Sequence, residues 1–237
     1  MIKYFRRIRQ RLISEGNLKR YLIYATGEIL LVVIGILIAL QINNWNEWRK
    51  DRVKEKVILI DLVKNVEINI QTFQNDINLL EDWGRSSEII IQALESKSVY
   101  SDTLRPHFHN ARITKQNLFI SNIGYQSYKD SGLDLITNKY LSEEIIKLYE
   151  YTIPALLSTN YLVNVLDAKW DNYVVQNFDF VEEVGLTPND YKALFSDHYY
   201  ISWIKAYSQG RIFLINTDQT LIKECESVLK LIQDELK

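Results

Sequence analysis

An uninterrupted apolar run near the N-terminus constrains this chain more than any other part of its sequence. Residues 29–40 read ILLVVIGILIAL and carry no charged side chain. Extended to the flanking residues, the segment has about 22 residues and a helical length of about 33 Å, enough to cross a hydrocarbon core of about 30 Å. Aromatic residues that favour the membrane interface flank the run: Tyr21 and Tyr24 before it, Trp45 and Trp48 after it. We therefore predict a transmembrane helix over residues 21–43.

A cleaved signal peptide is the alternative interpretation, because a basic region followed by a short apolar run has the same outline. Two features oppose it. Residues 41–45 read QINNW and lack the small-x-small cleavage pattern. The basic region before the run, of about 20 residues, is also long for a signal peptide. We expect an uncleaved anchor.

Charge is distributed unevenly along the chain. The net charge of -2 argues against a globally basic nucleic-acid binder, so no nucleic-acid partner is expected. The residues from Lys3 to Arg20 include seven Lys or Arg side chains and a single acid, Glu15. Because positively charged flanks of a membrane helix tend to stay in the cytoplasm, we predict residues 1–20 as a cytoplasmic tail. Residues 44–237 are then a domain outside the cytoplasm.

The basic tail has a helical pattern of its own. Apolar residues of the tail share one helical face, and the positive charge comes from Arg6, Arg7, Arg9 and Arg11. Such a helix would lie on an anionic lipid surface. A tail that only fixes the topology draws on the same charges and is an equal alternative.

One acidic residue, Glu28, lies inside the predicted span. At about 100° per residue, it belongs to a stripe about 80° wide. The stripe contains Ala25, Glu28, Val32, Gly35, Ala39 and Asn43. Gly35 and Ala39 would let another helix approach closely, and a carboxyl group in lipid needs a polar partner. We predict a helix-contact surface formed by Ala25, Glu28, Val32, Gly35 and Ala39.

The role of Glu28 has two interpretations. An ionised carboxylate is costly in hydrocarbon, so the side chain either holds a proton or pairs with a polar group. A structural role near the interface, with Lys19 or Arg20 in reach, is favoured over a proton- or ion-handling role because long side chains near helix ends snorkel to the headgroups.

Residues 27–47, with the sequence GEILLVVIGILIALQINNWNE, resemble the N-terminal signature of an uncharacterised family of single-span membrane proteins from Bacteroidetes-type bacteria, classed only as a domain of unknown function. Residues 131–138, SGLDLITN, are also similar to that family. The resemblance is specific over roughly the first 50 residues and loose beyond them. It implies a Gram-negative inner-membrane location for this single-pass chain, and it carries over no catalytic residues. With the orientation predicted from the basic residues, the C-terminal domain would be periplasmic.

The predicted external domain is all-α. No Gly or Pro occurs from Asn44 to Trp83, so the membrane helix can continue outward. Apolar residues recur there at spacings of three and four: Leu59, Val63, Val66, Ile70, Phe73, Ile77 and Leu80. Either a homomeric coiled coil or an intramolecular bundle produces such a seam. Further apolar residues at Ile60, Leu62 and Ile68 widen the face and favour a bundle of long antiparallel helices.

The rest of the domain reads as two more long helices and a short one. The second long helix is predicted from a cap at Ser142 to about Phe178, kinked at Pro154, and the third from about Asp197 to the C-terminus. A short helix over residues 122–130 ends at Gly132, followed by a connector that packs through Leu133, Leu135 and Ile136. Residues 185–189 are expected to form a loop.

Motifs that indicate chemistry are missing from the sequence. There is no Gly-rich phosphate loop, nucleophile-elbow serine or H-E-x-x-H. His107 and His109 would need further ligands, such as His198 or an Asp, to bind a metal, and Asp167 with Asp171 reads as a solvated helix face. The only cysteine, Cys225, is expected in the core. We expect no cofactor, no metal and no catalytic activity.

Three functional hypotheses follow. The leading one is a non-enzymatic assembly or scaffold subunit that self-associates, or binds a membrane-protein partner, through the Glu28 stripe. The second is a sensor in which a ligand binds the external bundle, which would require a polar-lined pocket. The third is an ion-coupling subunit that uses Glu28.

Overall fold

The computed structural model describes residues 18–113, 117–158, 172–181 and 185–237. The chain divides into two compact units, Met1–Lys54 and Glu55–Lys237, and each is described by itself. Most of the described residues are helical, which confirms the all-α prediction.

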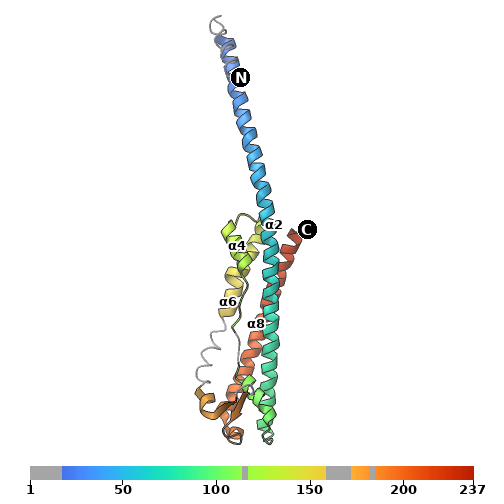
Figure 1. The fold of residues 1–237 in the computed structure, drawn as a ribbon, viewed down its shortest axis with the longest axis vertical. Helices are drawn as coiled ribbons and strands as arrows, with labels where there is room; N and C mark the ends of the chain where they lie inside the picture. Colours follow the sequence, from blue (N-terminus) through green and yellow to red (C-terminus); the bar gives the residue numbers. More distant parts are fainter. Residues whose placement is uncertain (1–17, 114–116, 159–171, 182–184) are drawn as a thin grey trace. The chain divides into compact units, whose positions relative to one another are not determined.

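The longest element is the helix α2, which extends over Leu18–Glu95 (Figure 1). It continues past Trp83, the last residue of the stretch free of Gly and Pro, because Gly84 is tolerated within it. The helix ends where Lys97 adopts a left-handed conformation, with φ of 52°. The amide of Ser98 then donates to the carbonyl of Ala93, as expected at a helix C-terminus.

The second unit is built on α2 and the C-terminal helix α8, which extends over His198–Glu235. Asp197 caps α8, since its side chain accepts a hydrogen bond from the amide of Tyr200, and this confirms the predicted start. Two contacts show that α8 is antiparallel to α2: Lys205 pairs with Glu95, and Arg211 bonds to Ser87. Figure 1 shows the two helices side by side in this unit.

The seam of α2 fills the core of the second unit. Five of its seven residues are buried, namely Leu59, Val66, Phe73, Ile77 and Leu80, and the other two, Val63 and Ile70, pack against the core in the partly buried class. Cys225 and Ile232 of α8 belong to the same cluster, so Cys225 is a core residue as predicted. The chain's own helices therefore cover the seam.

The prediction that Ile60 and Ile68 belong to the buried face of α2 was wrong. Ile60 and Ile68 are 40% and 51% exposed, whereas Leu62 is fully buried. At about 100° per residue, Ile60 and Ile68 lie on the side of α2 that faces away from Leu62.

The segment after α2 crosses the bundle in short elements. A 3-10 turn over Asp102–Leu104 leads into α3, Arg105–Ala111, and the short helix α4 covers Ile123–Ser131. Gly132 ends α4 with a φ of 94°, a conformation that favours glycine, as predicted. In the connector that follows, Leu135 and Ile136 are buried, but Leu133 is 43% exposed and does not pack as predicted.

The predicted cap at Ser142 was wrong. The helix α5 covers Lys139–Lys147, and the side chain of Asn138 caps it by accepting from the amide of Leu141. Ser142 is instead buried, with its hydroxyl 2.7 Å from that of Tyr128. Both residue types are good caps, so only the contact with Tyr128 distinguishes them.

The predicted kink coincides with a change of helix type. A π-helical turn over Leu148–Thr152 joins α5 to α6, Ile153–Ser158, and Pro154 is the second residue of α6. Proline cannot supply the amide that an α-helix needs, and the wider turn precedes it. Residues 172–177 are helical again and end before Phe178.

A small hairpin was not predicted. The strands β1, Phe178–Val181, and β2, Gly185–Pro188, pair antiparallel, so the expected loop begins as a strand. A 3-10 turn over Ala193–Ser196 then leads to α8. The hairpin belongs to a second core cluster, which is rich in aromatic residues and includes Phe108, Phe178, Tyr200 and Tyr207.

Candidate functional site

The predicted contact stripe lies in the exposed part of α2. None of the most apolar window of this helix is buried, and by length and composition α2 is the one helix among the described residues able to cross a membrane. Gly35 and Ala39 are exposed, whereas Ala25 and Glu28 are partly covered. A Cβ added at Gly35 would meet no atom within 4 Å, so the helix leaves room for close approach at this position.

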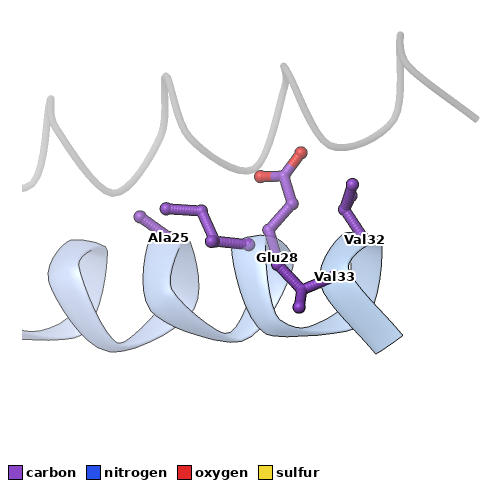
Figure 2. Close-up of a pocket in the computed structure, with 5 residues that line it drawn as sticks. Ala25, Glu28, Val32 and Val33 are labelled. Carbon is purple, nitrogen blue, oxygen red and sulfur yellow. The ribbon is translucent and has the colours of Figure 1, made fainter. Parts of the chain in front are cut away.

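Figure 2 shows how Glu28 lies on this helix. Its carboxyl group extends away from the α2 ribbon, between Ala25 and Val32. These residues, with Ile29 and Val33, line a recess of about 330 Å³. A carboxyl group thus stands among apolar and small side chains, the surroundings in which a polar partner from another helix is stabilising.

The predicted membrane-surface residues Arg6, Arg7, Arg9 and Arg11 lie outside the described residues, as do Asp167 and Asp171. The stripe is therefore the part of the predicted site that the structure places.

The sequence analysis missed a row of buried polar side chains along the core side of α2: Glu55, Asn65, Asn69, Asp76, Ser86 and Ser87. Two of them bind backbone groups of the irregular segments that cross the bundle. The Asn69 amide donates to the carbonyl of Ser121 at 2.9 Å and accepts from its amide at 2.7 Å. Glu55 accepts from the amide of Thr137 at 2.7 Å. These side chains satisfy backbone groups that no helix or sheet pairs.

Asp76 and Asp218 form a buried carboxyl pair at the middle of the unit, where α2 meets α8. Their exposed fractions are 4% and 3%. Burial, together with a hydrogen bond and the charge from Asp76, raises the pKa of Asp218 well above that of an ordinary carboxyl group. Two buried carboxylates cannot both ionise cheaply, so the pair holds a proton.

Arg211 is a buried cation on α8, about two helical turns before Asp218. Its guanidinium donates to Ser87 Oγ at 2.8 Å, to the carbonyl of Ala111 at 2.6 Å and to that of Ile113 at 3.0 Å. Two of these acceptors lie at and just after the C-terminus of α3, where the helix dipole favours a positive charge. Burial lowers the pKa of Arg211 to about 10, which leaves it protonated at neutral pH.

The histidines do not form a metal centre with other ligands in the described part of the chain. No group of three or more His, Cys, Asp or Glu side chains suited to a metal ion occurs there. His107 Nδ1 lies 3.1 Å from Ser86 Oγ. Burial and the nearby Arg112 lower the pKa of His109. Cys225 is buried, and its pKa is raised by that burial to about 12, so it is not a reactive thiol.

An aromatic group near α4 combines packing and charge. Tyr125 stacks on Tyr149 with ring centroids 4.7 Å apart, and its hydroxyl donates to Glu150 at 2.9 Å. Lys129 pairs with the same carboxylate at 2.8 Å, and the two contacts hold the pKa of Glu150 below its ordinary value. The group stabilises the contact between α4 and the π-helical turn.

The comparisons with known proteins add one match. Residues 28–102 match the model of a family of unknown function, DUF6090. The matched residues include most of α2 and the predicted span from Glu28 onward, whereas residues 131–138 lie outside them. No curated protein and no solved structure matches the chain.

Proposed function

We propose that this protein is a non-enzymatic subunit of a bacterial inner-membrane assembly, anchored by one helix and joined to another membrane helix through the Glu28 stripe. The observation that carries the proposal is the exposed apolar part of α2, in which a carboxyl group lies on the same stripe as Gly35 and Ala39. Lipid provides no side chain that fills the space beside Gly35 and Ala39, whereas a second helix fills it by close packing.

Buried polar groups of the second unit such as Asn69 and Arg211 bind its own backbone and so contribute to the fold. The inner-membrane location and the periplasmic side of residues 44–237 are parts of the proposal, and they rest on the basic residues before the span and on the resemblance of residues 27–47.

Crosslinking of the full-length protein in native membranes tests the proposal. An amine-reactive crosslinker is applied to the wild-type protein and to Glu28→Gln and Gly35→Ile, and the products are identified by mass spectrometry. We expect the wild type to be captured with itself or with one defined membrane protein. Gly35→Ile should reduce capture at least tenfold because a branched side chain separates the helices, and Glu28→Gln should reduce it less because the amide still forms hydrogen bonds.

Gly27→Ile is the matched control. Gly27 lies on the same helix, and a Cβ there also meets no atom within 4 Å, but at about 100° per residue it falls outside the stripe. This variant should be captured like the wild type. Recovery of monomer alone from wild-type membranes, or equal capture from Gly35→Ile and the wild type, would overturn the proposal.

A further inference from the structure

Within the second unit, α2 is apolar on two opposite sides. Its core side carries Leu62 and Val66, which are fully buried. The opposite side, which we term the outer face, consists of Val57, Ile60, Lys64 and Ile68. Its three apolar residues are 54%, 40% and 51% exposed, in chain order. At about 100° per residue, the four positions lie within about 80° of one another.

The apolar part of the outer face is short. The next outer positions, Gln71 and Asn75, are exposed and polar, and their side chains bond to each other at 2.9 Å. A helix that needed only one buried side would be polar at Val57, Ile60 and Ile68 as well. A contiguous row of exposed branched residues is typical of a contact surface.

We propose that the outer face packs against the same face of a second copy of this chain, in a parallel pair. The inference rests on the proposed function: two copies anchored in one membrane have the same orientation, so their α2 helices meet in parallel. Val57, Ile60 and Lys64 follow the spacing of three and four that two-stranded helix pairs use. In heptad terms Val57 and Lys64 occupy a positions and Ile60 occupies a d position. The next d position is the exposed Glu67, where the apolar contact ends, and Ile68 is the e position beside it.

The charges beside this row fit a parallel pair. In the same register Lys56 is a g position and Asp61 is the e position five residues later. In a parallel pair, each g residue faces the e residue of the following heptad on the other helix. Lys56 of each copy therefore lies opposite Asp61 of the other, so a pair of opposite charges flanks the contact between the two outer faces on each side. Asp61 also holds Lys64 of its own helix at 3.0 Å, which offsets the positive charge at that a position.

The pairing depends on the anchor. Three apolar side chains per copy bury far less than the roughly 1,200–2,000 Å² of a stable interface between free proteins. Two chains held in one membrane meet at a high effective concentration, and a small contact area is then sufficient. The second copy is thus the occupant for which this small surface is adequate.

Cysteine crosslinking of the full-length protein in membranes tests the inference. Cys225 is the only cysteine and is fully buried, so an introduced cysteine is the only thiol accessible for disulfide crosslinking. We expect Ile60→Cys to form a disulfide-linked dimer on oxidation with copper phenanthroline. Ser227→Cys, at an exposed position of α8, is the matched control and should stay monomeric. Absence of the Ile60→Cys dimer, or equal dimer from both variants, would overturn the inference.

Charge reversal tests the register. In the Ile60→Cys background, Lys56→Glu should reduce dimer yield several-fold because it faces Asp61, and adding Asp61→Lys should restore it. A yield unchanged by the single reversal would overturn the parallel register.

The Gly35→Ile change separates this inference from the proposed function. Loss of the Ile60→Cys dimer with persistent Gly35-dependent amine crosslinking would refute the outer-face pair alone. A dimer that forms equally well with Gly35→Ile would refute the role of the membrane stripe and leave the outer face in place.

Discussion

At the scale of single residues, the buried carboxyl pair makes stability depend on pH. Burial beside Asp76 raises the pKa of Asp218 to about 8, so the folded protein holds a proton that the unfolded chain releases above the ordinary value of 3.8. Stability from this residue is therefore present at low pH and is lost as the pH rises from about 4 toward 8, by at most about 1.4 kcal/mol per pH unit.

Asp218→Asn should remove this dependence. The amide keeps the size and a hydrogen bond to Asp76 but does not titrate, so the variant should gain stability over the wild type with each step from pH 5 to pH 8. Chemical unfolding of the full-length protein in detergent measures the difference. Asp82→Asn, at an exposed position of α2, is the control and should follow the wild-type curve. Parallel curves for Asp218→Asn and the wild type would show that the pair holds no extra proton.

Arg211 gives a second prediction at this scale. Arg211→Met fills a similar volume but leaves Ser87 Oγ and the carbonyls of Ala111 and Ile113 without their donor. We expect a loss of about 2–4 kcal/mol in the free energy of unfolding. Arg85→Met, which breaks an exposed ion pair with Asp82, should change it by less than about 1 kcal/mol. Similar losses for the two variants would mean that the buried guanidinium contributes no more than a surface one.

At the scale of elements, two glycines separate packing from helix propensity. A Cβ at Gly124 would lie 3.0 Å from the backbone of Asp61, so Gly124→Ala should push α4 away from α2 and cost about 1–3 kcal/mol. A Cβ at Gly84, within α2, meets no atom within 4 Å, and Gly84→Ala should stabilise the helix by about 0.5–1 kcal/mol. Thermal unfolding of both variants shows whether Gly124→Ala lowers the stability and Gly84→Ala raises it. A neutral Gly124→Ala would show that α4 shifts freely.

The same scale shows what the sequence could predict. Long periodic helices with a clear cap, such as α8 after Asp197, were predicted because pattern and capping agree. The start of α5 was not, because Asn138 and Ser142 are both capping residues and a distant contact with Tyr128 decides between them. The hairpin was missed because each strand has only four residues, and β2 begins with Gly185 and ends with Pro188, two residue types that are depleted in strands.

The buried polar row was missed for a different reason. Asp76 lies three residues after Phe73, on the core side of the periodic pattern, so its burial could have been predicted from spacing alone. Its pairing with Asp218 could not, since that contact joins two helices far apart in the sequence. The stripe around Glu28 could be derived from the sequence because it depends only on the repeat of one helix, and its role as a contact surface stays a prediction.

At the scale of the whole molecule, the proposed membrane anchor gives a topology prediction. The intact chain, with residues 1–43 retained, should resist carbonate extraction from bacterial membranes, because an uncleaved apolar helix stays in lipid. A reporter fused after Lys237 that works only outside the cytoplasm should be active, and one that works only in the cytoplasm should be silent. A mature protein that starts after residue 43 would show that the segment is a signal peptide.

The antiparallel arrangement of α2 and α8 also has a mechanical consequence. Glu55, where the chain enters the second unit, binds Thr137, and the adjacent Asn138 donates to Glu235 near the C-terminus at 2.6 Å. Entry and exit of the chain thus lie at the same end of this unit. A pulling force applied between Glu55 and the C-terminus would unzip α8 from α2 layer by layer, from Glu235 toward Asp218, instead of shearing every layer at once. Under load, the bundle would yield gradually and at low force.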